Sequence, residues 1–271
     1  MNKIIIQIYE VQKPKEAEAL VSMGVDHIGS VIVSENRWKQ PAVRRCVQTA
    51  QRGGAKSGII PLSRNPVKIF TAIDYYRPDF VHLCDVISPF PRERQTIVRD
   101  FDAHLSLQVD IKDRFPQIDI MRSISIPRPG WPDAAQIQKN VLDVASRLAP
   151  VSDYFLIDTL LAGSTQPVEG FVGITGERCD WTIARAVIEA SPIPVILAGG
   201  ISDENVYEAI VKLKPAGVDS CTKTNASGRQ GQPIRFKKDM NKVRRLIEEV
   251  RRADAFRQTN NSPGRHHAKG I

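Results

Sequence analysis

Short apolar runs rich in Val and Ile alternate with longer segments of helical period along the whole chain. Most of these runs are nearly continuous rather than alternating, which is the pattern of parallel strands buried on both faces. Eight runs are predicted to be strands: Lys3–Tyr9, His27–Val33, Lys56–Pro61, Phe80–Cys84, Ile118–Ile126, Tyr154–Asp158, Val195–Ala198 and Val218–Cys221.

The segments between the predicted strands repeat their apolar residues with the period of an α-helix. Ser202–Asn205 carries the small polar residues that cap a helix N-terminus. After the last strand, Ile234–Arg252 has apolar residues near one face and Lys and Arg on the other, which predicts a final helix. The other predicted helices are Pro14–Met23, Gln40–Arg52, Pro66–Tyr76, Pro91–Phe115, Asp133–Leu148, Asp180–Ala190 and Asp203–Leu213.

Strands that alternate with helices from end to end predict an α/β fold with a parallel sheet. Eight such units form a TIM (β/α)8 barrel, and 271 residues is a usual size for one. No G-x-G-x-x-G sequence follows a predicted strand, so a dinucleotide-binding fold has no support. We expect one barrel domain over residues 1–252 and a polar, disordered basic tail over 253–271. The pair His266-His267 in that tail is interpreted as solvent-exposed rather than as a metal site.

The composition, 42% hydrophobic and 25% charged, supplies a large core. The longest apolar runs fall far below the roughly 20 residues that cross a bilayer, so no membrane partner is expected. The N-terminus also lacks the features of a secretory signal. The four cysteines stand far apart with no C-x-x-C pair, which argues against a zinc ribbon or a disulfide scaffold and favours a reducing, cytoplasmic location: Cys46, Cys84, Cys179 and Cys221.

The net charge of +8 is concentrated at the C-terminal end. Residues 235–271 carry a surplus of seven positive charges, and the rest of the chain a surplus of one. A nucleic-acid-binding domain would carry a basic face on its folded body. We therefore interpret the basic end as a solvated surface and expect no nucleic-acid partner.

Polar residues follow several predicted strands, and in a TIM barrel these strand ends form the active-site mouth. Asp158 ends strand six, so its carboxylate is expected to face the mouth as an acid or base, unless it only caps the next loop. Cys84 ends strand four beside Asp85 and is either a site residue or a small buried hydrophobe. Arg37, after strand two, is a candidate clamp for a carboxylate or a cover for the barrel rim.

A candidate phosphate site follows strands seven and eight. Gly199 and Gly200 let the backbone approach an oxyanion, while Thr222 and Lys223 add a hydroxyl and a cation in the next turn. The glycine pair could equally be a plain strand-to-helix turn.

An ordered series of segments extends from about residue 3 to residue 250: Ile28–Val33 with Ser34–Arg37, Leu156–Thr159, Gly173–Gly176, Asp180-Trp181, Ile196–Ile201 with Glu204–Val206, and Pro215–Ser220. This series resembles the phosphoribosylanthranilate isomerase family, most strongly in the last third of the chain. The segment after residue 28 is similar to that family's Gly-Phe-x-Phe and Ser-Pro-Arg motifs.

The resemblance implies a TIM barrel that binds a phosphorylated, ring-opened pentose and needs no metal or organic cofactor. The implied reaction is an Amadori-type aldose–ketose isomerisation of tryptophan biosynthesis. Asp158 matches the family's general acid, which protonates the ring oxygen, while a cysteine after strand one removes the C2 proton. Arg37 matches the residue that meets the aromatic carboxylate. The remaining matches are Thr175 and Gly176 in a mobile glycine-rich loop, and Gly199, Gly200 and Cys221–Asn225 in the phosphate loops.

In strand one, this chain differs from the family at the position of the catalytic base. The family's Lys-Ile-Cys-Gly-Ile-Thr aligns without gaps to Gln7–Gln12, so Tyr9 stands at the cysteine and Glu10 at the glycine. A phenol with a pKa near 10 is a poor base, whereas a partly desolvated glutamate reaches a useful pKa. Tyr9 and Glu10 are both candidate replacement bases. Each also has an ordinary alternative, Tyr9 in packing and Glu10 as an exposed loop acid.

Two further departures concern strands four and eight. The family's Gln-Leu-His-Gly becomes His82-Leu83-Cys84-Asp85, so a cysteine has moved to another strand. His82 is expected to be a core histidine, although an inward-facing one would reach the site. Lys223 replaces a phosphate-contacting glycine.

Three hypotheses remain open from the sequence. The first is an isomerase-like enzyme, monomeric or homodimeric, that acts on a phosphorylated sugar or sugar-amine with a replaced base. The second is a non-catalytic phosphosugar-binding protein, or a relative with changed chemistry, on the same barrel. In the third, the basic C-terminal end binds an acidic partner or RNA.

Overall fold

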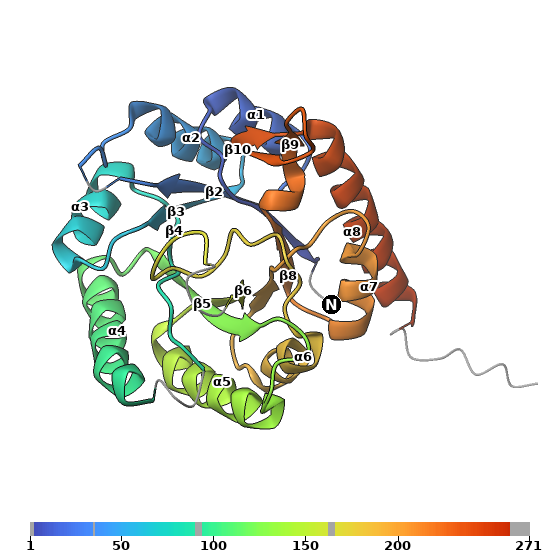
Figure 1. Cartoon of the computed structure of the whole chain (residues 1–271). Helices are drawn as coiled ribbons and strands as arrows, with labels where there is room; N and C mark the ends of the chain where they lie inside the picture. The colour runs from blue at the N-terminus through green and yellow to red at the C-terminus, as the bar shows by residue number, and fades with distance from the viewer. Residues whose placement is uncertain (1–2, 35, 90–93, 162–165, 261–271) are drawn as a thin grey trace, which may run out of the picture.

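The computed structural model describes residues 3–34, 36–89, 94–161 and 166–260. Parallel strands close into a barrel in chain order, with β1 hydrogen-bonded to β8, and helices surround it (Figure 1). The predicted TIM barrel is confirmed, with each predicted strand present within two residues of its expected ends. The strands are β1 (Ile5–Ile8), β2 (His27–Ile32), β3 (Lys56–Pro61), β4 (Phe80–Leu83), β5 (Asp119–Pro127), β6 (Tyr154–Leu160), β7 (Val195–Leu197) and β8 (Gly217–Ser220).

The helices begin where the sequence supplies start signals. Proline occupies the first turn of the first three helices, where its missing N–H costs nothing. Asp180 caps α6 by accepting from the backbone N–H groups of Thr182 and Ile183 at 2.8 and 3.3 Å. The helices are α1 (Pro14–Ser22), α2 (Pro41–Arg52), α3 (Pro66–Tyr76), α4 (Arg94–Arg114), α5 (Ala134–Leu148), α6 (Trp181–Ala190), α7 (Val206–Leu213) and α8 (Met240–Asn260), with the short 3₁₀ helices η2 (Ala149–Val151) and η4 (Thr222–Thr224).

The segment expected to open the final helix is a strand instead. β10 (Pro233–Lys238) pairs antiparallel with β9 (Asn225–Ser227), and this hairpin lies at the barrel rim between α1 and α8 (Figure 1). Phe236 has a φ of 60°, which breaks a helix, and Asp239 caps α8 by accepting from the N–H of Asn241 at 2.9 Å. Ile234 is therefore a strand residue, and the helix starts six residues later than predicted.

The last helix also extends beyond residue 252, where we expected the tail to begin. Ala253 and Asp254 are buried, and the carboxylate of Asp254 accepts from the N–H of Ile4 at 3.3 Å. The tail expected from 253 is thus helical through Asn260, and the remainder, including His266-His267, lies outside the described residues. Within the described ranges, no helix is long and apolar enough to cross a membrane.

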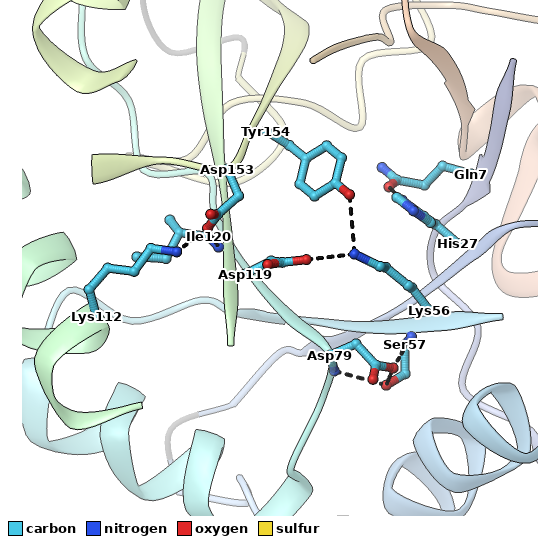
Figure 2. A network of polar contacts seen from close by, with 10 residues as sticks. All are labelled: Gln7, His27, Lys56, Ser57, Asp79, Lys112, Asp119, Ile120, Asp153 and Tyr154. Atoms are coloured by element: carbon cyan, nitrogen blue, oxygen red, sulfur yellow. Dashed lines mark hydrogen bonds and ion pairs between the residues drawn. The ribbon is translucent and has the colours of Figure 1, made fainter. Parts of the chain in front are cut away.

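The barrel interior contains one side chain of every two along each strand, because side chains alternate across a strand. Tyr9, Val31, Ile60, Met121 and Leu156 belong to one buried apolar cluster that fills this interior. Toward the N-terminal end of the strands the inward side chains become polar, as Figure 2 shows. Toward the other end the barrel opens into the mouth described below.

Candidate active site

Two carboxylates meet at the mouth of the barrel. Asp158 lies near the end of β6 and Asp219 near the end of β8, and both line two adjoining cavities there. The glycines 199 and 200 line the second of these cavities, so the acid and the glycine pair share one mouth. The sequence predicted Asp158 at this position, whereas Asp219 lies within the Pro215–Ser220 segment and has no predicted role of its own.

Asp158 is enclosed by the loop that follows its own strand. Its Oδ1 accepts from the backbone N–H of Thr159 at 2.7 Å. A β-carbon at Gly173 would lie 2.4 Å from the other carboxylate oxygen, so only glycine lets this loop approach so closely. Burial raises the pKa of Asp158 to about 7, despite the opposing effect of the N–H bond.

Asp219 is more deeply buried, with 5% of its surface exposed. Its Oδ1 has no hydrogen-bond partner among the described residues. Gln7 is its register partner on β1, and the side chain of Gln7 lowers the pKa of Asp219. Burial, followed by the negative charge of Asp158, raises the pKa of Asp219 to about 8. Between about pH 7 and 8, therefore, the two carboxyl groups together hold one proton.

Tyr9 lies inside the barrel below the mouth. Its ring contacts the backbone of β2 at Gly29, and its hydroxyl approaches Met121 Sδ at 3.6 Å, deeper in the barrel. Burial, with the negative charge of Asp219, raises the pKa of Tyr9 well above its ordinary value. The phenol therefore remains protonated at neutral pH.

Glu10 also lines the mouth, but its carboxylate is already engaged. Arg235 of β10 contacts Oε1 through Nε at 2.7 Å and through Nη2 at 2.5 Å, and Asn225 Nδ2 donates to Oε2 at 3.3 Å. Glu10 is 1% exposed and has a φ of 63°, the left-handed conformation that suits the family's glycine. It is thus not the exposed loop acid that one of the two sequence interpretations described.

Cys84 and His82 face the same cavity from β4 and its end. Burial, reinforced by the charge of Asp85, raises the pKa of the Cys84 thiol far above its usual range. Burial lowers the pKa of His82 to about 3, and its Nε2 lies 2.7 Å from Ser123 Oγ. His82 is thus a neutral, buried histidine that also reaches the site.

The candidate phosphate residues gather in one polar cavity. Gly176 lies against Thr222, since a β-carbon there would be 3.1 Å from the Thr222 methyl group. Gly199 and Gly200 have positive φ angles of 80° and 65°, and Lys223 is exposed beside them. Thr175 also lines this cavity, and its Oγ1 accepts from the N–H of Glu177 at 3.1 Å. Backbone N–H groups, hydroxyls and a cation together form a typical anion site.

Arg37 does not line either cavity of the mouth. It is exposed in the loop after β2, where its backbone N–H donates to Ser34 Oγ at 3.3 Å. Trp38 is half-buried behind it. Both predicted roles of Arg37, as a clamp for a carboxylate and as a cover for the barrel rim, therefore stay predictions.

Sequence reasoning missed two residues that shape the mouth. Asp219 could have been recognised as the acidic residue inside the Gly217–Ser220 strand. Lys238 gave no signal, because it lies in a segment that was interpreted as helix. Its buried ammonium donates to Cys221 O at 2.9 Å and to Asn225 Oδ1 at 2.7 Å, which fixes the turn after β8.

Comparison with known proteins gives consistent results. The sequence model of the family described as N-(5'-phosphoribosyl)anthranilate (PRA) isomerase matches residues 129–249. An N-(5'-phosphoribosyl)anthranilate isomerase of Methanocella arvoryzae is 30% identical over 249 residues, which cover 91% of this chain and 97% of that protein. N-(5'-phosphoribosyl)anthranilate isomerase 1 of Methanosarcina mazei is 28% identical over 263 residues, covering 94% and 97%.

The fold is also shared with solved structures. The N-(5'-phosphoribosyl)anthranilate isomerase of Pyrococcus furiosus superposes with a TM-score of 0.64 and 18% identity, over 92% of this chain and 99% of that one. At this identity the likeness concerns the fold. It confirms the barrel that the sequence predicted.

Proposed function

The chain belongs to the N-(5'-phosphoribosyl)anthranilate isomerase family, a family of aldose–ketose isomerases, and from this premise we propose that Asp158 and Asp219 carry out the isomerisation together. The observation that carries the proposal is a pair of carboxyl groups, one half-buried and one buried, in one mouth with the candidate phosphate loops. The substrate is a phosphorylated sugar-amine. Asp219 takes over the role of the thiol that strand one lacks.

The reaction needs one acid and one base. Asp158 donates its proton to the ring oxygen, the C1–O bond breaks, and a Schiff base forms at C1. Asp219 then removes the proton from C2, and the resulting enolamine tautomerises to the aminoketose. One proton leaves the pair and one returns, so the reaction balances without an external redox partner.

The alternative bases are less suited to this step. Tyr9 holds its proton strongly and directs its hydroxyl toward Met121, away from the mouth. Both carboxylate oxygens of Glu10 are already bonded, Oε1 to Arg235 and Oε2 to Asn225, so neither is free to approach a substrate proton. Cys84 is buried beside the negative charge of Asp85, which disfavours the thiolate.

Substrate orientation follows from the distribution of polar groups. The backbone, hydroxyl and ammonium groups that would bind a phosphate come from one cavity, which Thr175 also lines. The residues are Gly176, Gly199, Gly200, Thr222 and Lys223. Arg37, outside the cavities, reaches a carboxylate at the rim only if its loop turns inward. The apolar part of the mouth, which includes Leu62, Phe171 and Val172, suits an aromatic ring.

The test is turnover of N-(5'-phosphoribosyl)anthranilate by the purified protein, followed by chromatography, together with complementation of a tryptophan auxotroph. Asp219→Asn is expected to lower kcat/KM by roughly 10²–10⁴-fold, the usual contribution of a general base. Asp74→Asn is the matched control, because Asp74 is 56% exposed on α3 and pairs with Arg114 outside the mouth cavities. No turnover, with retained phosphosugar binding in calorimetry, would instead favour a binding protein.

A further inference from the structure

A row of polar side chains crosses the barrel interior over four neighbouring strands. Asp219 is the register partner of Gln7, Gln7 is the partner of His27, and His27 is the partner of Lys56. Register partners on adjacent strands project their side chains to the same face, here the inside of the barrel. Burying such groups costs free energy unless they form hydrogen bonds with one another. The hydrogen bonds within this row therefore determine how each side chain is oriented.

Gln7 is the central link of this row and is fully buried. His27 Nδ1 lies 3.1 Å from Gln7 Oε1, and because an amide oxygen only accepts, Nδ1 is the donor. This contact turns the NH2 group of Gln7 the other way, where it lies 3.6 Å from Met121 Sδ. The neighbouring side chain on β8 is that of Asp219, whose pKa the Gln7 amide lowers. The two ends of an amide have nearly the same shape, so its partners determine its orientation.

His27 is held in a fixed, neutral state. Burial, followed by the positive charge of Lys56, lowers the pKa of His27 to about 4, against the opposing charges of Asp26, Asp119 and Asp79. A neutral imidazole has a single N–H, and the contact with Gln7 assigns it to Nδ1.

The surroundings of His27 are equally well defined. Figure 2 shows Lys56 between Asp119, whose Oδ2 is 2.6 Å from Nζ, and the hydroxyl of Tyr154 at 3.2 Å. The rings of Tyr154 and Phe80 pack against the imidazole with centroids 5.6 and 5.3 Å away. The side chains at the N-terminal end of the barrel thus hold the imidazole of His27 in one position.

We infer that Gln7 and His27 are positioning residues: His27 orients the Gln7 amide so that its N–H group faces Asp219 and stabilises the negative charge there. The inference rests on the proposed function, in which Asp219 is the base. Gln7 lowers the pKa of Asp219, against burial and the charge of Asp158, and so favours the ionised form that a base requires.

The other ionisable groups around Asp219 come from several elements. Asp158 of β6 and Cys221 after β8 face it in the mouth, and Tyr9 after β1 lies inside the barrel below the mouth. The charge of Lys238 on β10 acts on it as well. Exchanging Gln7 for an apolar residue of similar length removes none of these groups. A shift in the titration of Asp219 in such a variant therefore reports the Gln7 contact.

The variant is Gln7→Met, and the measurement is the titration of ¹³C-labelled aspartate carboxyl groups by NMR, with Asp219→Asn to assign the signal. We expect the titration of Asp219 to move up by about one pKa unit and kcat/KM at its optimum to fall by about tenfold. A purely structural role would lower stability and leave the titration where it is. An unmoved titration in the folded variant overturns the inference.

His27 offers a second, independent variant pair. His27→Phe keeps a ring between Tyr154 and Phe80 but removes the donor, so the titration of Asp219 should again rise. His27→Asn restores an N–H near the position of Nδ1 and should reverse most of that rise. Phe80→Leu loosens the packing of the same imidazole without touching the hydrogen bonds, and no shift is expected. Equal titrations in the Phe and Asn variants would overturn the inference even if Gln7→Met fails to fold.

The two proposals fail in different ways. If the wild-type protein does not convert the isomerase substrate, the proposed function fails, while the NMR titration still decides the role of Gln7. If the protein is active and neither Gln7→Met nor His27→Phe moves the titration or the pH profile, the positioning role fails and the function stands.

Discussion

A β-carbon at Gly29 would lie 2.0 Å from two ring carbons of Tyr9. The glycine of β2 therefore provides the space that the large residue at the end of β1 occupies. The ring also packs against that of His82, with centroids 5.2 Å apart. Tyr9 is thus part of the barrel core rather than a group that reaches out to substrate.

This contact predicts that Gly29→Ala is destabilising by about 1–3 kcal/mol, the usual cost of overpacking a core. In a Tyr9→Cys background the same change should cost less, because the ring that it meets is gone. Urea unfolding of the four proteins in the cycle gives the coupling energy. Additive effects of the two substitutions would show that the ring does not depend on the space at Gly29.

The carboxyl pair predicts a bell-shaped pH dependence of kcat/KM. The burial-raised pKa values of Asp158 and Asp219, about 7 and 8, define a window in which the pair holds one proton. Activity should peak between these values, fall at lower pH as both groups are protonated, and fall at higher pH as both ionise. Steady-state kinetics from pH 5 to about 10 test this, and a flat profile from pH 5 to 7 would contradict a carboxylate base.

The same groups predict a pH dependence of stability. Unfolded aspartate has a pKa near 3.9, so between about pH 4 and 8 the folded protein binds more protons and loses stability as the pH rises. His27 and His82, whose pKa values are lowered to about 4 and 3, act in the opposite direction only below about pH 6.5. From about pH 6.5 to 8, therefore, the carboxyl groups alone predict a falling Tm.

Asp219→Asn removes one of these groups and should raise the Tm at pH 8 by a few degrees, since about 1 kcal/mol moves the Tm of a chain this size by roughly 2–4 °C. The gain should shrink toward pH 5, where the wild-type carboxyl group is protonated. Calorimetry at the two pH values measures both. A gain of the same size at each pH would point to packing rather than charge.

The sequence predicted the barrel because each element carries its own local signal. The strands are continuous apolar runs, and prolines or a capping Asp180 mark several helix starts. The β9–β10 hairpin was missed because Ile234, Lys237 and Lys238 also fit a helical pattern. Its strand conformation depends on the left-handed backbone at Phe236, within the stretch where the register between the strands shifts, and on pairing with β9.

The site was predictable only in part. Asp158 and the glycine loops are set by their positions at strand ends, which the sequence reveals. The ion pair of Glu10 with Arg235 joins residues 225 positions apart, and no local pattern encodes it. The row from Asp219 through Gln7 to His27 depends on the register between strands, which only the closed barrel establishes.

The proposed phosphate site predicts a separation of binding from chemistry. Lys223→Ala should raise KM by about tenfold, corresponding to about 1.4 kcal/mol, with little change in kcat, because the cation contacts a group that does not react. Lys212→Ala is the control, since Lys212 is an exposed lysine of α7 that pairs with Glu208. Inorganic phosphate should inhibit the wild type competitively and the Lys223 variant more weakly. Equal inhibition of the two would remove Lys223 from the site.

The contribution of the Glu10–Arg235 ion pair to stability can be tested by a rescue experiment. Arg235→Ala leaves a carboxylate that is 1% exposed without its cation, and such a loss costs about 3–5 kcal/mol when both partners are buried. Because Arg235 is 39% exposed, water replaces part of the contact, and we expect about 1–3 kcal/mol.

Adding Glu10→Gly should restore most of this stability, since glycine adopts a φ of 63° without strain and leaves no buried charge. Urea unfolding of the single and double variants provides the measurement. If the double variant is no more stable than Arg235→Ala, the arginine stabilises the hairpin through contacts other than Glu10. If it recovers, the hairpin holds the mouth mainly by neutralising the acid that stands at the family's glycine.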